Sequence, residues 1–581
     1  MNIYSSRISA LRDEMKKRRL DAYVVYYSDP HLSEYMHDHF KLREWLTGFT
    51  GSYGFVVITL NDAALWTDSR YTVQAKIQLS GLDIEQIQDR TPDTPLYTDW
   101  LSQKIEENSR VGYDAQLISA KEFASVCKPS SFVWVDSGDI FETIASDIIP
   151  LTFNPILLHD IAYCGESRDR KIESVREFMQ SYNMDYYLVS ALDEIAWLLN
   201  LRGNDIEYNP VFYSYVIVSR EEVTLYTGSD IDVKHFGNLK VSVKPYNTYF
   251  TDLNHLTGVV GYDPTKSTQK TIASLKENRI EADSPITLKK SIKNETEIHG
   301  AIQAHLEDGK ALIAFWKWLE EHAQDGFTEY EIGEKLHQFR AKSSLFVQDS
   351  FAPIVGYQEN GAIVHYSASK DSKKIVGSGL LLIDSGGQYY VGTTDITRTF
   401  AIGEVRDVMK RDYTNVLKGV IALSEAIFPK GYSGCHLDIL ARTALLKNRT
   451  NYGHGTGHGV GSFLNVHEGP MSIRPDYNNQ PLQKGQVLSN EPGIYIEGAY
   501  GIRIENLVYV KEDISNEFGD FLSFQTLTMF PLELKLIDKE LLTHNEVLWI
   551  NNYHESVKES LLKLGLEADQ EAFLLKKTAS I

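Results

Sequence analysis

Residues 380–400 have the sequence LLLIDSGGQYYVGTTDITRTF, and this segment decides how the second half of the chain is expected to fold. An apolar run ends at Asp384, a glycine-containing stretch follows, and Asp395 opens what we expect to be the returning strand of a hairpin. Either aspartate alone would be explained by a turn. The spacing of eleven residues across a hairpin, however, can bring both carboxylates to one side of a sheet.

A second pair of acidic residues has a similar arrangement. Glu491 and Glu505 lie on the two arms of another expected hairpin, VLSNEPGIYIEGAYGIRIEN, residues 487–506. Between the two pairs, the segment HGTGHGVGSFLNVHEGP (residues 454–470) supplies His454, His458 and His467. Four acids and several histidines at apolar or glycine-rich positions are hard to explain by structure alone, so we expect a functional cluster.

Charge balance indicates what this cluster would bind. Four converging carboxylates would raise one another's pKa values unless cations lay between them, and two divalent ions would neutralise all four. An oxygen-rich set with one imidazole suits manganese, cobalt or iron better than a structural zinc ion. Paired metals activate water and polarise a carbonyl. The sequence therefore predicts a dinuclear hydrolytic centre.

The rest of the chain indicates several domains of mixed α/β type. With 581 residues, of which 43% are apolar, the chain can build more than one core. Two stretches look like copies of one unit, and they begin at SRISALRDEMKKRRL and at DRKIESVREFMQSYN. In each stretch a helix is followed by a buried strand, a segment that contains Trp-Leu, and two further strands. A third region begins near Ile286 with a long amphipathic helix over 294–322. We expect an α/β (α+β) protein with domains at 1–160, 161–285 and 286–581.

Composition excludes some classes of partner. The net charge of −21 argues against a nucleic acid or an anionic membrane, since both require a basic face. The three cysteines, Cys127, Cys164 and Cys435, form no C-x-x-C pattern, which predicts neither a disulfide framework nor a thiolate metal site. No apolar run of about 18 residues occurs, so we expect no membrane span and a cytoplasmic location.

This chain resembles the "pita-bread" metallopeptidases in the segments DSGGQYYVGTTDITRTF, HGTGHGVGSFLNVHEGP, NEPGIY and GIRIENLVYV. Within that family it is similar to the three-domain Xaa-Pro aminopeptidases (aminopeptidase P), including the cytosolic eukaryotic type. The resemblance extends to WLTGFTGS and WTDSRY, to SALDEIAWLLNLRGNDIEYNPVF, and to EVLWINNYH. It implies two creatinase-like N-terminal domains followed by a pita-bread catalytic domain.

The resemblance also implies roles for individual residues. The five metal-ligand positions of the family fall on Asp384, Asp395, His458, Glu491 and Glu505, and none is substituted. Asp395 and Glu505 would bridge two divalent ions, with Mn²⁺ as the expected metal and Co²⁺, Fe²⁺ and Zn²⁺ as alternatives. Asp384 would bind one ion, and His458 with Glu491 the other. His365, His454 and His467 fall on the family's active-site histidines that are not ligands, and His454 and His467 would bind substrate and steady the tetrahedral intermediate. Tyr495 and Arg503 would support the site from behind the ligands.

The implied reaction is hydrolysis of the bond between an N-terminal residue and a penultimate proline. A metal-bridging hydroxide would attack the carbonyl before proline, Glu491 would shuttle the proton, and His467 would stabilise the oxyanion or contact the proline side. The implied substrates are peptides with proline at position two, and the implied assembly is a homodimer through the catalytic domain.

Other functions on this fold stay open at this point. A prolidase, which cleaves Xaa-Pro dipeptides, would use the same ligands, although the extra domain favours an aminopeptidase that accepts longer peptides. Methionine aminopeptidases generally lack two preceding domains, and creatine hydrolysis uses the fold without metals. Non-catalytic relatives that bind histones or other partners have lost ligands, whereas all five are present here.

Overall fold

The computed structural model describes residues 2–581 except 90, 92 and 277. The chain divides into two compact units. The N-terminal unit comprises Met1–Leu158 and Glu166–Ile286, and the C-terminal unit comprises His159–Gly165 and Thr287–Ile581. The predicted domain boundaries, at residues 160 and 285, stay predictions.

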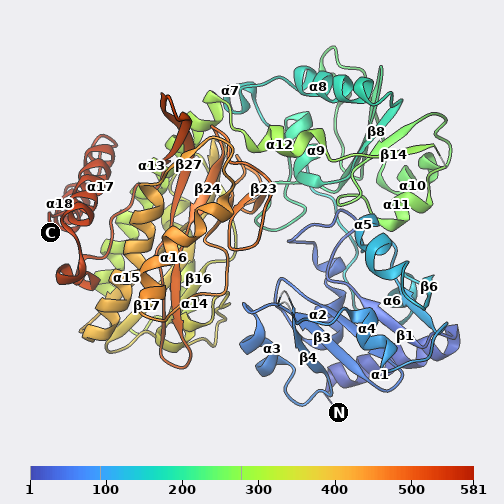
Figure 1. Cartoon of the computed structure of the whole chain (residues 1–581), viewed down its shortest axis with the longest axis horizontal. Coiled ribbons are helices and arrows are strands. Elements are labelled where there is room, and N and C mark those ends of the chain that lie inside the picture. The colour runs from blue at the N-terminus through green and yellow to red at the C-terminus, as the bar shows by residue number, and fades with distance from the viewer. Residues whose placement is uncertain (1, 90, 92, 277) are drawn as a thin grey trace. The chain divides into compact units, whose positions relative to one another are not determined.

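The N-terminal unit contains one strand arrangement twice (Figure 1). In the first copy, α1 (Ile3–Arg18) precedes a sheet with the order β4-β3-β2-β1-β5-β6. Its strands are β1 (Ala22–Val25), β2 (Phe55–Thr59), β3 (Ala63–Thr67), β4 (Glu85–Gln88), β5 (Arg110–Tyr113) and β6 (Val133–Asp136). The central strand β1 is buried along its whole length, as its apolar sequence predicts.

In the second copy, α8 (Arg168–Ser181) precedes a sheet with the order β12-β11-β10-β8-β13-β14. Its strands are β8 (Tyr186–Val189), β10 (Ser214–Ser219), β11 (Val223–Thr227), β12 (Val241–Pro245), β13 (Val260–Tyr262) and β14 (Arg279–Glu281). Each neighbouring pair is parallel or antiparallel as in the first copy. The predicted duplication is confirmed at the level of topology.

The C-terminal unit begins with the predicted long helix. This helix, α13 (Glu295–His322), is capped by Asn294 and Glu297, whose side chains bond to each other's backbone N–H groups. Its buried face includes Trp316, which contacts the rings of Phe400 and Phe530 in the core. A second predicted helix, α14 (Glu329–Arg340), follows.

Antiparallel sheets carry the segments predicted for the site. One has the order β16-β17-β20, with β16 (Ile354–Tyr357), β17 (Gly379–Ser385) and β20 (Ile396–Ile402). Another has the order β21-β28-β27-β24-β22-β23, with β21 (Ile427–Pro429), β28 (Gly519–Thr526), β27 (Asn506–Asn516), β24 (Val487–Asn490), β22 (Gly457–Gly459) and β23 (Glu468–Ile473). The helix α15 (Asp407–Ser424) contacts β24 and β28, and α16 (Asp438–Lys447) packs against α15 (Figure 1).

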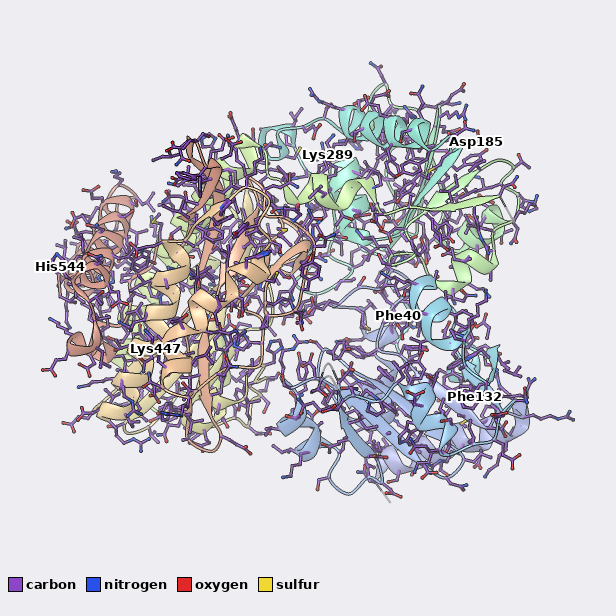
Figure 2. All side chains as sticks on the ribbon, viewed as in Figure 1. Phe40, Phe132, Asp185, Lys289, Lys447 and His544 are labelled. Carbon is purple, nitrogen blue, oxygen red and sulfur yellow. The ribbon has the colours of Figure 1, made fainter. Side chains whose placement is uncertain are left out.

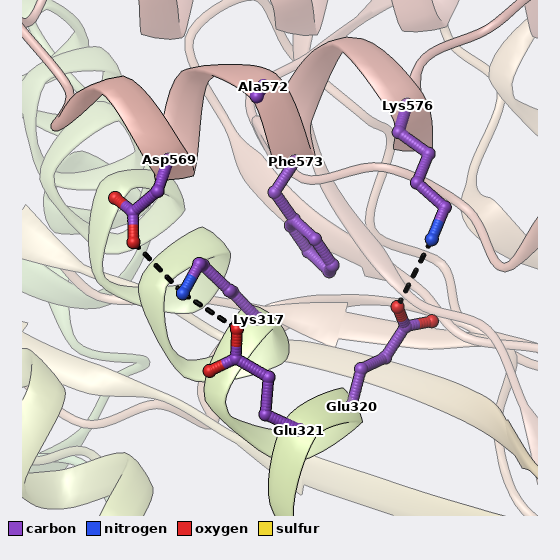
Figure 3. A pocket seen from close by; sticks show the side chains of 7 residues that line it. All are labelled: Lys317, Glu320, Glu321, Asp569, Ala572, Phe573 and Lys576. Carbon is purple, nitrogen blue, oxygen red and sulfur yellow. Dashed lines mark hydrogen bonds and ion pairs between the residues drawn. The ribbon is translucent and has the colours of Figure 1, made fainter.

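The chain ends in two helices, α17 (His544–Leu562) and α18 (Ala568–Lys577). His544, at the start of α17, and Lys447, at the end of α16, are labelled in Figure 2. Figure 3 shows how α18 attaches to α13: Lys317 pairs with Glu321 and Asp569, and Lys576 with Glu320, around the ring of Phe573. The charged residues that line this pocket are therefore already engaged in ion pairs, two of which, Lys317–Asp569 and Lys576–Glu320, join the two helices.

Among the helices that the structure describes, none combines the length and the apolar sequence needed to cross a membrane.

Candidate metal centre

The first acidic pair is built by the strands β17 and β20. Asp384 lies on β17 and pairs with Thr397 of β20, while Asp395 directly precedes β20. The predicted hairpin is confirmed, but the residues between its arms form two further strands, β18 (Gly387–Tyr389) and β19 (Gly392–Thr393), which join β15 (Phe346–Asp349). Gly386 allows this turn because a Cβ there would overlap the carbonyl oxygen of Thr394.

The second acidic pair is built by β24 and β27. Glu491 follows β24 and Glu505 precedes β27, and Asn490 pairs with Asn506 between them. An inner hairpin of β25 (Gly493–Ile496) and β26 (Tyr500–Arg503) closes the connection. The Glu505 backbone N–H donates to the Thr397 carbonyl at 3.1 Å. This bond joins the second hairpin to the first and brings the two acidic pairs together.

His458, on β22, faces both pairs. Its Nε2 lies 3.5 Å from Asp395 Oδ2 and 3.6 Å from Glu491 Oε1. Candidate ligand atoms of Asp395, His458 and Glu505 all lie within 4.8 Å of one another. The Nδ1 of His458 lies 2.9 Å from the Gly459 carbonyl, which can only accept, so Nδ1 carries the proton and Nε2 offers its lone pair. This is the tautomer that a metal ligand requires.

The electrostatics of the cluster fit cations. Burial, followed by the neighbouring carboxyls, raises the pKa values of Asp395, Glu491 and Glu505 well above the ordinary range. Asp384 Oδ1 is buried and has no hydrogen-bond partner among the described residues. Carboxyl groups that repel one another, and a buried oxygen without a donor, are stabilised when divalent ions bind between them.

Three of the predicted site residues that are not ligands, Arg503, Tyr495 and His454, form a chain of contacts to Asp384. The Arg503 guanidinium donates to Asp384 Oδ2 at 2.6 Å and to the Tyr495 hydroxyl at 2.7 Å. The Tyr495 hydroxyl lies 2.8 Å from His454 Nε2. Since His454 Nδ1 lies 2.7 Å from the Gly455 carbonyl, Nδ1 carries the proton and Nε2 accepts from Tyr495.

The other two predicted histidines are placed by their neighbours. The ring centroid of His467 is 4.3 Å from that of His458, with the planes nearly perpendicular. His365 follows Val364, whose carbonyl lies 3.5 Å from an Arg503 nitrogen. The structure therefore brings His467 to the cluster and the His365 segment to its edge, and the role of His365 stays a prediction.

Sequence reasoning missed two hydroxyl residues in the centre. Thr397 donates to Glu505 Oε2 at 2.9 Å and accepts from Arg503 Nε at 3.2 Å. Ser489 accepts from the His458 backbone N–H at 2.9 Å and donates to Glu491 Oε1 at 3.3 Å. Strand alternation could have found both, because each lies two residues from a predicted ligand and thus on the same face.

Comparisons with known proteins follow the order of these units. Residues 7–144 and 149–297 each match a family described as Creatinase/Prolidase N-terminal domain. Residues 300–512 match Metallopeptidase family M24, and residues 520–581 match the C-terminal region of peptidase_M24. A protein from Tuber melanosporum, named probable Xaa-Pro aminopeptidase P, is 40% identical over 96% of this chain and 95% of its own.

Solved structures show the same relationship. The X-prolyl aminopeptidase from Caenorhabditis elegans, described as a cytosolic enzyme with a di-nuclear active site, matches all of both chains with a TM-score of 0.96 and 32% identity. The prolidase from Pyrococcus horikoshii matches 99% of its own chain but 63% of this one, with a TM-score of 0.51 and 25% identity.

Proposed function

This chain belongs to metallopeptidase family M24, in the group of Xaa-Pro aminopeptidases, and on that premise we propose that it removes the first residue of peptides whose second residue is proline. The observation that carries the proposal is the convergence of five potential ligands in the fold of an X-prolyl aminopeptidase that matches the whole chain. Neither the set of ligands nor the match in fold would suffice alone, because this fold supports several reactions.

We propose that Asp384, Asp395, His458, Glu491 and Glu505 hold two divalent ions. The donor set, mostly carboxylate oxygens with one imidazole, favours Mn²⁺. Bound ions would supply Lewis-acid polarisation of the peptide carbonyl and activation of water. The oxygen of Asp384 without a hydrogen-bond partner and the raised carboxyl pKa values support this assignment.

Glu491 is the proposed proton shuttle. Its side chain is 18% exposed, whereas that of Asp395 is 5% exposed, so a reactant entering from solvent meets Glu491 more readily. Its carboxylate also lies 4.0 Å from His454 and 3.6 Å from His458, between a proposed substrate residue and a proposed ligand. A group that moves a proton must reach both the reactant and its neighbours.

The other polar residues would orient the substrate. His454, held by Tyr495, and His467, beside His458, are proposed to bind the peptide and to stabilise the tetrahedral intermediate. Arg503 would keep Asp384 and Tyr495 in place. His365, at the edge of the centre, is proposed to contact the substrate as well.

A prolidase activity is the second candidate, and one observation disfavours it. The Pyrococcus horikoshii prolidase accounts for 63% of this chain, while the Caenorhabditis elegans aminopeptidase accounts for all of it. Comparing kcat/KM for Xaa-Pro-Yaa and Xaa-Pro substrates on the Mn²⁺-loaded protein separates the two. We expect preference for the longer peptide, and a clear preference for the dipeptide would replace the proposal by a prolidase. Complete inactivity toward both, with metal bound, would favour a non-catalytic binding protein.

We further propose a cytoplasmic homodimer that associates through the C-terminal unit. The description of the Caenorhabditis elegans enzyme as cytosolic supports the location. Light scattering coupled to size exclusion tests the assembly, because one chain has a mass of 65.9 kDa and a dimer would have twice that value.

A further inference from the structure

Helix α16 carries a buried ion pair that faces the HGTGHG segment. Asp438 and Arg442 are one helical turn apart, and both are at most 4% exposed. Arg442 binds Asp438 through Nε at 2.6 Å and through a terminal nitrogen at 3.1 Å. The fork of the guanidinium is thereby fixed, and its remaining donors point away from the aspartate.

The remaining donors hold the backbone before the proposed ligand His458. Arg442 donates to the Tyr452 carbonyl at 2.7 Å and to the His454 carbonyl at 2.9 Å, and lies 3.9 Å above the ring of Tyr452. The Thr456 hydroxyl donates to Asp438 Oδ1 at 2.6 Å. Alternate residues of the segment are therefore fixed from the side of α16.

The opposite side of the same segment faces the centre. The ring of His454 bonds to Tyr495, and the Thr456 carbonyl accepts from the Glu491 backbone N–H at 2.9 Å. Thus α16 contacts the backbone of His454, while Tyr495 contacts its ring. A shift of this segment would move His454 and Glu491 together, because His454 is part of the segment and the Glu491 backbone is bonded to Thr456.

We propose that Asp438, Arg442 and Thr456, here called the α16 brace, are positioning residues that set His454 and Glu491 for catalysis. This inference rests on the proposed aminopeptidase function. A buried ion pair alone would be explained by stability. The brace differs because three of its hydrogen bonds end on the segment that carries the proposed substrate and ligand histidines.

The test compares Thr456→Val with Thr456→Ser. Valine has the shape of threonine but cannot donate to Asp438, whereas serine can. For the Mn²⁺-loaded protein with an Xaa-Pro-Yaa peptide, we expect T456V to lower kcat by about 10- to 100-fold with KM changed by less than about threefold, as for outer-shell partners generally. T456S should restore most of the activity. Thr443→Val is the matched control, because Thr443 is exposed on the same helix and its hydroxyl donates to the Ile439 carbonyl within α16, at 2.7 Å.

Hydrogen exchange of the metal-free protein supplies a readout that does not depend on activity. Amides of residues 452–458 should exchange faster in T456V than in T456S or T443V, because the segment loses the Thr456 bond to Asp438, one of its three hydrogen bonds to α16. Should T456V not fold, Arg442→Lys, which keeps the charge but not the fork, takes its place with the same expected results.

Three results would overturn the brace. The first is an equal kcat for T456V and T456S. The second is recovery of the T456V activity by excess Mn²⁺, which would show that the substitution weakens metal binding. The third is an equal loss of kcat in T443V, which would show that any change in α16 lowers activity. An inactive wild-type protein would refute the proposed function instead, and the exchange of residues 452–458 would then decide the brace by itself.

Discussion

Replacing Asp395 with Asn is expected to stabilise the metal-free protein at neutral pH and to abolish its response to Mn²⁺. The Asp395 side chain is 5% exposed, and burial together with the carboxyls of Asp384 and Glu491 raises its pKa. Asparagine has nearly the same shape without the charge. The substitution therefore removes a repulsion from the metal-free centre and, at the same time, removes a ligand from the loaded one.

The magnitude follows from proton linkage. The pKa of Asp395 is raised in the folded chain above its ordinary value of 3.8, so the folded chain holds a proton that the unfolded chain releases. The free energy of unfolding then falls as the pH rises from the unfolded pKa toward the folded one, by about 1.4 kcal/mol per pH unit for each such proton. The pKa values of Glu491 and Glu505 are also raised in the folded chain. With one to three such protons, the free energy of unfolding falls by between about 1.4 and about 4 kcal/mol per pH unit. Asp395→Asn should reduce this slope by the contribution of one proton, about 1.4 kcal/mol per pH unit.

Calorimetry between pH 5.5 and 8 with a chelator measures this slope. The transition of the C-terminal unit has to be resolved, because two compact units can unfold separately. Asp407→Asn is the control, since Asp407 is fully exposed and its replacement should leave the pH slope unchanged. Added Mn²⁺ should flatten the pH dependence of the wild type and leave D395N unaffected. A metal-free stability that does not depend on pH, or a D395N protein less stable than the wild type, would refute the idea of repelling carboxylates.

Further predictions concern the support of the centre. Thr397→Val removes the donor to Glu505 and should weaken Mn²⁺ binding about 10- to 100-fold by calorimetric titration, whereas the serine variant should bind nearly as the wild type does. Tyr495→Phe removes the hydroxyl between Arg503 and His454 and should lower kcat by about tenfold or more at unchanged metal content, measured by peptide release together with elemental analysis. Chelation should abolish activity and lower the melting temperature at pH 7.5, and added Mn²⁺ should restore both; retained activity in metal-free protein would contradict this.

The fold was predictable where the local signal was strong. The helix α13 follows from its apolar period and its Asn294 cap, and the duplicated unit follows from two helix-strand patterns in the same order. The strands β18 and β19 could not be predicted from the hairpin, because the pairing of β18 with β15 joins residues far apart in the sequence. Long-range pairing of short strands leaves little local pattern.

The centre was predictable as a set of residue types and only partly as a geometry. Two acidic hairpins and a histidine-rich segment indicated metals, and family resemblance supplied the individual roles. The bond from Glu505 to the Thr397 carbonyl, which joins the hairpins, involves backbone atoms and has no signature in the sequence. The brace from α16 likewise depends on tertiary packing between a helix and a segment with no periodic pattern of its own.

The most direct test of the whole account is a titration of metal-free protein with Mn²⁺, in which bound metal and the release of the first residue from an Xaa-Pro-Yaa peptide are measured on the same samples. We predict that activity saturates at two ions per chain, that the products are the free first residue and a peptide beginning with proline, and that D395N shows neither full binding nor release. Full release without bound metal, or two bound ions with no cleavage before proline, would contradict the account.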